Sequence, residues 1–216
     1  MKYYPAFLDL RGKPVVVIGG GRVAERKVRT LLSCGARVTV VSPVLTKKLD
    51  RLGRAGAIRH RKRLWRPADL KNAMLILAAT NDRTANSEIA RLADFRTRLV
   101  NAVDDPDRCS FIAPAILTRG DLIVAISTSG QNPALAKKLR GELERTIGPE
   151  YGKYLKLLAR IRNQVQARVP SIEKRRRILN RLAESDLLTW VRRGGKLQIR
   201  KRIERIRGMK GIGIKI

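Results

Sequence analysis

The chain has 216 residues, of which 44% are hydrophobic, and its 48 Lys and Arg against 18 Asp and Glu give a formal net charge of +30. It is long enough for one large or two modest domains and apolar enough to bury a core, which excludes a largely disordered protein. We see no signal peptide and no apolar run near the ~18 residues that cross a bilayer, so we expect a cytoplasmic protein without a membrane partner. Two cysteines and one histidine provide neither a disulfide framework nor a multi-histidine metal site, and we predict no metal ligands.

The most informative segment is an apolar run, Pro14–Ile18, followed at once by three glycines and a helical pattern from Ala24 to Cys34. Positions 19, 21 and 24 fit the fingerprint Gly-x-Gly-x-x-Ala, in which Gly19 permits the tight turn and Gly21 lets the backbone approach a ligand. The free N–H groups at the start of the helix favour phosphate oxygens. The segment therefore predicts a dinucleotide-binding turn.

Strand-like and helix-like segments then alternate, as a parallel sheet covered on both faces requires. The expected segments, in chain order, are strand Arg37–Val41, helix Leu45–Arg54, a short strand near Ile58, strand Met74–Ala79, helix Thr84–Phe95 and strand Leu99–Val103. Ligands of such sheets bind beyond the carboxyl ends of the strands. We therefore expect four loops to face one crevice: Gly19–Val23, Ser42–Val44, Thr80–Arg83 and Asp104–Asp107.

One element of the fingerprint is missing after the second strand. NAD-binding proteins commonly place an Asp or Glu there to bind the ribose hydroxyls, whereas this chain has Ser42, Pro43 and Val44. Ser42 and the backbone around it are weaker ribose ligands. No Arg follows this strand to hold a 2′-phosphate, which favours NAD mildly, and local chemistry leaves the choice between NAD and NADP open.

Past residue 110 the alternation of strand and helix ends. Ser110–Leu117 and Leu122–Ser127 indicate an antiparallel hairpin, and a helix from Ala134 to about Ile147 follows it. A hairpin with one helix is too small to bury a core by itself. We therefore expect this segment to mediate homodimerisation or to pack on the first domain.

Three further helices are expected, near Tyr151–Arg168, Ser171–Ser185 and Asp186–Arg193. The first of them places four apolar side chains on one stripe: Leu155, Leu158, Ile161 and Val165. The predicted fold class is α/β. It consists of a Rossmann-type parallel-sheet domain over residues 1–112, a small α+β dimerisation segment over 113–147 and a basic helical C-terminal domain over 148–216.

The basic charge is concentrated toward the C-terminus. Residues 151–216 hold 20 basic and 4 acidic side chains, a net charge of +16. Such a surface favours anionic partners, and nucleic acid is the usual one. Only 4% of the residues are aromatic, however, and no stacking platform or nucleic-acid motif is present, which argues against nucleic acid. A small polyanionic substrate or a solvated basic face explains the same charge.

Six motifs follow one another along the chain: Phe7–Lys13, Val17–Lys27, Ala78–Asp82, Val100–Asp104, Ser110–Ala115 and Ser127–Ala134. This series resembles the precorrin-2 dehydrogenase family, which includes the N-terminal module of bifunctional siroheme synthases. The resemblance covers roughly residues 3–150. It continues more weakly through the helices, where Glu173–Arg177 looks similar to a basic helix of the family.

The resemblance implies NAD-dependent oxidation of precorrin-2 to sirohydrochlorin, followed in some members by insertion of ferrous iron. It also implies a homodimer and a tetrapyrrole substrate whose carboxylates a strongly basic cleft would attract. No metal-ligand spacing in the chain decides whether iron is inserted. The sequence also leaves open whether the product enters siroheme, cobalamin or haem synthesis.

By position, the resemblance places the cofactor contacts at Gly19, Gly21, Arg22, Val23, Pro43, Val44, Thr80 and Asn81. It places the tetrapyrrole beside Asn101, Ser127, Thr128, Ser129 and Gly130. Thr128 stands where some siroheme synthases have a serine that can be phosphorylated, and whether it is regulatory stays open.

Asp104 matches the acidic residue thought to take the proton in the family, at Asn-x-x-Asp spacing from Asn101. A carboxylate is chemically plausible as this base because no histidine is available nearby. Two alternatives stay open: the base is the adjacent Asp105, or Asp104 is only a turn residue before Pro106.

Two interpretations from other classes also stay open. A nucleotide-sensing regulatory domain would share the glycine turn, but its usual acid after the second strand is absent and the later motifs would be unexplained. A nucleic-acid-binding protein would explain the basic tail but leave the dinucleotide turn without a role.

Overall fold

The computed structural model describes residues 2–93, 98–103, 105–206 and 213, and its contacts divide the chain into two compact units. The first unit contains Met1–Ala113 and Ser129–Gln131, and the second contains Pro114–Thr128 and Asn132–Ile216. The hairpin segment and the helical C-terminal segment, predicted as separate domains, thus share one unit. No helix within the described ranges is both long and apolar enough to cross a membrane.

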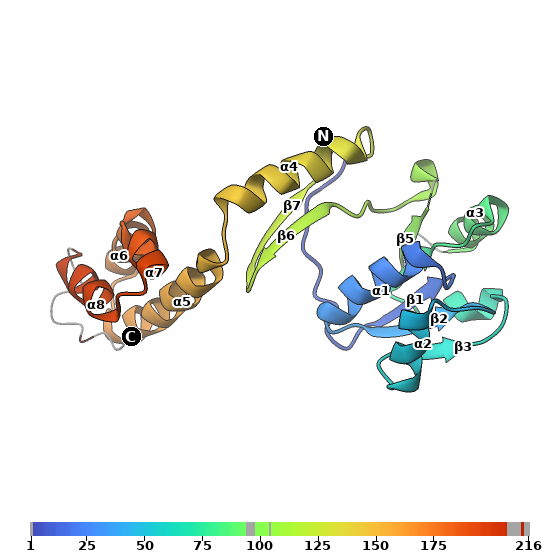
Figure 1. Ribbon diagram of the computed structural model, residues 1–216, viewed down its shortest axis with the longest axis horizontal. Helices are drawn as coiled ribbons and strands as arrows, with labels where there is room; N and C mark the ends of the chain where they lie inside the picture. Colours follow the sequence, from blue (N-terminus) through green and yellow to red (C-terminus); the bar gives the residue numbers. More distant parts are fainter. Residues whose placement is uncertain (1, 94–97, 104, 207–212, 214–216) are drawn as a thin grey trace. The chain divides into compact units, whose positions relative to one another are not determined.

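Five parallel strands form the sheet of the first unit, in the order β3-β2-β1-β4-β5. They are β1 Pro14–Ile18, β2 Arg37–Val41, β3 Arg59–Arg61, β4 Leu75–Ala78 and β5 Leu99–Ala102. Figure 1 labels β1, β2, β3 and β5 of this sheet. The central strands β1 and β4 are almost continuous runs of buried Val, Ile and Leu, as a sheet covered on both faces requires. Because β1 pairs with β2 on one side and β4 on the other, the connections diverge at its carboxyl end, where ligands of such folds bind.

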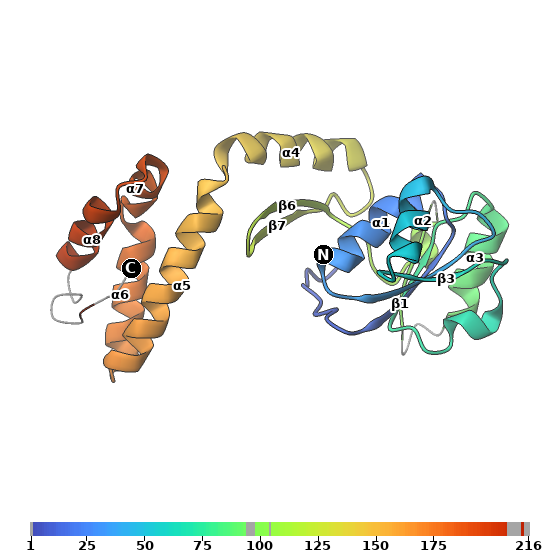
Figure 2. The same ribbon diagram turned by 60° about the horizontal axis from the view of Figure 1, so that its bottom comes forward.

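Helices cover both faces of this sheet (Figure 2). The helices α1 (Arg22–Ser33) and α2 (Lys47–Arg54) bury Val28 and Leu49 in one core, and α3 (Arg83–Leu92) lies on the opposite face. The Thr46 hydroxyl begins α2 by accepting a hydrogen bond from the Leu49 amide at 3.3 Å. The Rossmann-type prediction for this unit is confirmed.

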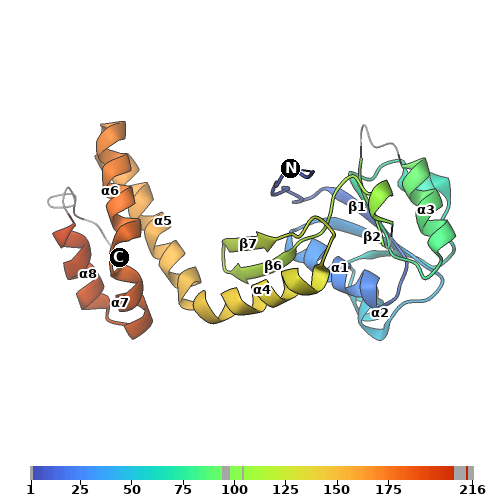
Figure 3. The same ribbon diagram turned by 90° about the horizontal axis from the view of Figure 1, so that it is seen from above.

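The second unit begins with a two-stranded antiparallel hairpin, β6 (Ala115–Arg119) and β7 (Leu122–Ile126), on which α4 (Pro133–Thr146) packs (Figure 3). The predicted first strand was too long at its start. The Ser110 amide donates to Val100 O at 2.9 Å and therefore belongs to the edge of the parallel sheet. Pro114 has no N–H to donate to a neighbouring strand, so the antiparallel hydrogen bonds of the hairpin begin only at Ala115, the first residue of β6.

In the described part of the second unit, four helices follow: α5 Glu150–Arg168, α6 Ile172–Glu184, α7 Leu187–Arg193 and α8 Lys196–Arg205. Helix α8 was not predicted, although Ile199 and Ile203 stand four residues apart and are buried in the core these helices share. The predicted stripe of α5 was partly wrong. The buried apolar side chains of α5 are Tyr154, Leu157, Ile161 and Val165, so the last two are as predicted. Leu158 packs against this core but is only partly buried, and Leu155 is not part of it.

Gly152 gives a test of the packing inside the second unit. A Cβ at this position of α5 would lie 2.8 Å from the carbonyl oxygen of Arg119, a backbone atom that cannot swing away. We expect Gly152→Ala to lower the free energy of unfolding by about 1–3 kcal/mol in urea titrations, the usual cost of overpacking. The control is Gly141→Ala in α4, where a Cβ meets nothing within 4 Å and should raise stability by roughly 0.5–1 kcal/mol. Equal effects of the two substitutions would contradict this account of Gly152.

Candidate dinucleotide-binding site

The turn after β1 is packed so closely that two of its glycines admit no side chain. Gly19 has a φ of +115°, and a Cβ there would fall against the carbonyl oxygen of Ala79. A Cβ on Gly20 would fall against the carbonyl oxygen of Val44. The turn is therefore clamped between the segments that follow β4 and β2. Gly20 stands at a position where the fingerprint allows any residue, yet here, as at Gly19, a side chain would collide with a backbone carbonyl oxygen.

Gly21 is a glycine for a different reason. It precedes α1 as its N-cap with an ordinary φ of −81°, and a Cβ there would meet nothing within 4 Å. The open space lies before the free N–H groups of the first helical turn, where a pyrophosphate would be held. Ala24, the last fingerprint position, is fully buried and lets α1 pack closely on the sheet. These features fit a bound dinucleotide.

A pocket of ≈ 430 Å³ opens at this turn. Six of the predicted cofactor residues line it: Gly19, Gly21, Pro43, Val44, Thr80 and Asn81. Arg22 and Val23 are exposed in the first turn of α1 but are not among its lining residues, so their contact with a cofactor stays a prediction. Leu64 and Trp65, which follow β3, also line the pocket and were not predicted.

Hydrogen bonds fix the two loops on either side of the turn. The Ser42 hydroxyl donates to Val44 O at 2.7 Å, so this side chain is used in its own turn and not held out toward a ribose. On the other side, the buried Asn86 amide oxygen accepts from the Thr80 hydroxyl at 2.8 Å and from the Thr80 amide at 3.1 Å. The walls of the pocket are therefore set before any ligand binds.

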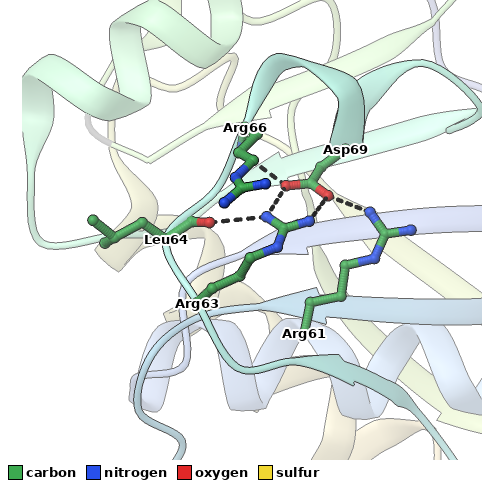
Figure 4. A network of polar contacts seen from close by, with 5 residues as sticks. All are labelled: Arg61, Arg63, Leu64, Arg66 and Asp69. Carbon is green, nitrogen blue, oxygen red and sulfur yellow. Dashed lines mark hydrogen bonds and ion pairs between the residues drawn. The ribbon is translucent and has the colours of Figure 1, made fainter.

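A buried carboxylate organises the loop that carries Leu64 (Figure 4). The Asp69 side chain is 1% exposed and accepts from both terminal nitrogens of Arg63 at 2.7 Å, from Arg61 and from the Arg66 amide at 2.8 Å. Arg63 also donates to Leu64 O at 2.9 Å. The hydrogen bonds from Arg63, with those of Arg66 and Arg61, lower the pKa of Asp69 to about 2, so it stays ionised.

Asn101 lies in β5 with its carboxamide engaged at both ends. Lys27 of α1 donates to its Oδ1 at 2.8 Å, and its Nδ2 donates to Phe111 O at 3.1 Å. A lysine has only donors, so the amide oxygen must face it. Burial of the ammonium group, and then the positive charge of the nearby Arg26, lower the pKa of Lys27. The predicted contact of Asn101 with a tetrapyrrole stays a prediction, and Lys27 was not singled out from the sequence.

Asp104 lies outside the described residues, so its predicted role is untested. Its neighbour Asp105 is held by the Ser87 hydroxyl at 2.7 Å and by Arg108 at 3.2 Å. The hydrogen bond from Ser87, followed by the contacts with Arg108, lowers the pKa of Asp105. A carboxylate stabilised in this way is a poor proton acceptor.

The loop after β7, which was predicted to border the substrate, forms hydrogen bonds within itself and with the start of α4. The Thr128 hydroxyl accepts from the Asn132 amide at 3.1 Å, and Asn132 Oδ1 accepts from the Leu135 amide at 2.9 Å, which caps α4. Ser129 and Gly130 adopt positive φ values of 55° and 83°. Ser127 and Thr128 belong to the second unit, and Ser129 and Gly130 to the first. Contact of these residues with substrate stays a prediction.

Fold and pocket together define a Rossmann-type dinucleotide-binding protein. Residues 6–115 match the family model described as putative NAD(P)-binding. Residues 119–146 match the central region of sirohaem biosynthesis proteins, and residues 150–206 match the sirohaem synthase dimerisation region. The last match covers the helices α5–α8, whereas residues 113–147 were predicted from the sequence to mediate dimerisation.

Several relatives with curated names are siroheme synthases. The chain is 39% identical to siroheme synthase 1 of Serratia proteamaculans over 94% of its length, and 42% identical to siroheme synthase 1 of Aeromonas salmonicida over 87%. It spans less than half of these relatives, 43% and 40% of their lengths. Among solved structures, "SirC, precorrin-2 dehydrogenase" is 27% identical with a TM-score of 0.79, over 94% of this chain and 98% of that one.

The chain therefore belongs to the putative NAD(P)-binding family, and its cofactor is of the NAD(P) class.

Gly21 provides the direct test of the pocket. Because a side chain at this position meets only open space, Gly21→Asp should fold normally but place a carboxylate where the pyrophosphate binds. We expect NAD binding to be lost in calorimetric titration while the melting temperature stays near that of the parent. Gly21→Ala is the matched control, since it adds a Cβ without charge and should bind more tightly than the aspartate variant. Unchanged NAD affinity in Gly21→Asp would contradict this site.

Asp69 gives a test by pH. The folded-state pKa of about 2 lies below the ordinary value of 3.8, so the stabilisation is present above pH ~4 and is lost as the pH falls toward 2. The difference in unfolding free energy between the parent and Asp69→Asn should therefore shrink by about 2 kcal/mol over this range. Urea titrations between pH 5 and pH 2 measure it. A difference that does not change with pH would show that Asp69 does not stabilise the fold through its charge.

Proposed function

We propose that this chain is an NAD-dependent precorrin-2 dehydrogenase, which oxidises precorrin-2 to sirohydrochlorin in siroheme biosynthesis. The observation that carries the proposal is the likeness to the precorrin-2 dehydrogenase SirC over nearly the full length of both chains. The sirohaem-specific regions at 119–146 and 150–206 support it, because a nucleotide-sensing domain or a nucleic-acid-binding protein leaves them unexplained.

The chemistry fits the described residues. NAD, when bound, accepts the hydride that leaves the tetrapyrrole. The chain contributes the rigid turn at Gly19–Gly21, which would hold the pyrophosphate, and the loops at Pro43 and Thr80, which would border the two halves of the cofactor. The net charge of +30 would attract a substrate that carries several carboxylates.

Oxidation also requires a proton acceptor, and we propose Asp104 for this role. The support comes from its neighbour, since the carboxylate of Asp105 is already used by Ser87 and Arg108. NAD rather than NADP is part of the same proposal, because no arginine directly follows β2.

The expected assembly is a homodimer in the cytoplasm, supported by the match of α5–α8 to a dimerisation region. Insertion of ferrous iron as a second reaction stays a prediction of the resemblance. Across the described parts of the chain, no three His, Cys, Asp or Glu side chains come together as a metal site.

The test is anaerobic turnover of precorrin-2 with NAD, followed by the absorption change to sirohydrochlorin. Asp104→Asn keeps the size of the side chain but removes its basicity, so turnover should fall by ~10²–10⁴-fold while NAD still binds. Asp105→Asn is the neighbouring control and should lose far less. Loss of turnover in Asp105→Asn alone would transfer the role to that residue, and normal turnover in both would exclude this loop from the chemistry. Absence of turnover in the parent protein would refute the proposed function itself.

A further inference from the structure

Two apolar side chains line the dinucleotide pocket without serving the fold. Leu64 is 74% exposed and Val44 is 75% exposed, so neither contributes to a core. Trp65, the residue after Leu64, is half-buried against the core on the α3 face of the sheet and also lines the pocket. Exposed apolar side chains that gather at a pocket are typical of a surface that a ligand covers.

The direction of the bound dinucleotide indicates which part of it reaches these residues. In such folds the pyrophosphate would lie at the turn after β1, and the ribose of the adenosine half would follow the end of β2. Beyond β2 the next strand is β3, and Ser42 N donates to Arg61 O at 3.2 Å where the two strands end together. The loop with Leu64 and Trp65 leaves the sheet at this point and lines the same pocket as the residues after β2, so an adenine ring beyond that ribose would lie beside it.

We propose that Leu64 and Trp65 form the wall against which the adenine ring of the dinucleotide packs, and that Asp69 positions this wall. A purine presents two flat apolar faces, and contact of a base with aromatic or aliphatic side chains stabilises it without reading its edge. The inference rests on the dinucleotide site proposed above and not on the identity of the second substrate.

Asp69 acts through the loop and not through the ligand. It binds Arg61 at the end of β3, Arg63 next to Leu64 and the Arg66 amide next to Trp65, so both ends of the wall are tied to one buried carboxylate (Figure 4). Asp69 itself is not among the lining residues of the pocket. It is therefore a positioning residue.

The experiment compares fragments of the cofactor. AMP and ADP-ribose contain the adenine, whereas nicotinamide mononucleotide does not, and equilibrium dialysis of each with the full chain gives its Kd. Leu64→Ser should weaken AMP and ADP-ribose by roughly fivefold to tenfold, the loss expected for one leucine contact, and leave nicotinamide mononucleotide unchanged. Leu197→Ser, a leucine 60% exposed in α8, is the matched control and should change none of them. Unchanged AMP affinity in Leu64→Ser, or equal weakening of all three ligands, would overturn the proposal.

Two further measurements separate positioning from general damage. Trp65 and Trp190 are the two tryptophans of the chain, so in Trp190→Phe the remaining fluorescence emission, that of Trp65, should change when AMP binds.

Asp69→Asn should weaken AMP binding in the parent protein but weaken it little further in the Leu64→Ser variant, since both changes act on the same wall. A fully additive double variant would overturn the role of Asp69. No tetrapyrrole enters these assays, so they stand or fall separately from precorrin-2 turnover.

Discussion

The contact of Gly19 and Gly20 with two neighbouring carbonyl oxygens is the constraint on which the dinucleotide site depends. At these two positions the turn after β1 has no space for a side chain, because the carbonyl oxygens of Ala79, after β4, and Val44, after β2, lie against it. Those segments are the other walls of the pocket. One steric requirement therefore fixes three loops together and leaves only Gly21 open toward a ligand, which makes the site rigid before binding.

Carboxylates are scarce in this basic chain, and several of them join segments that are distant in sequence. Asp69 gathers Arg61 and Arg63, and Glu25 of α1 accepts from the Thr46 hydroxyl at the start of α2 at 2.7 Å. Asp105 links its loop to α3 through Ser87. In each case the hydrogen bonds lower the pKa of the carboxyl group, so these acids hold loops in place as anions and are poor proton acceptors.

The sequence predicted those features that depend on local pattern. Buried β-branched runs and the glycine turn are contiguous in sequence, so the parallel sheet and the loops around the pocket followed from them. Leu64 and Trp65 could not be found in this way, because only the pairing of β3 with β2 brings them to the pocket. Helix α8 was missed since its interior is mostly basic and only Ile199 and Ile203 mark its buried face. Which residues of α5 are buried depends on the helices α6–α8 that pack against it. The apolar pattern of α5 by itself therefore predicted Leu155 and Leu158 where Tyr154 and Leu157 are buried.

Asn101 shows how a motif residue can carry a role that its pattern does not reveal. Its oxygen is held by Lys27 and its nitrogen by Phe111, so the carboxamide joins α1, β5 and the segment before the hairpin. Nδ2 also donates to Cys109 Sγ at 3.6 Å, and loss of Phe111 O as acceptor would leave a buried donor unsatisfied. The ammonium of Lys27 is different, because it has three donors and Asn101 is its one hydrogen-bond partner among the described residues. In this structure the amide is thus suited to orient the lysine, and the lysine retains two N–H donors for a further anionic or carbonyl partner.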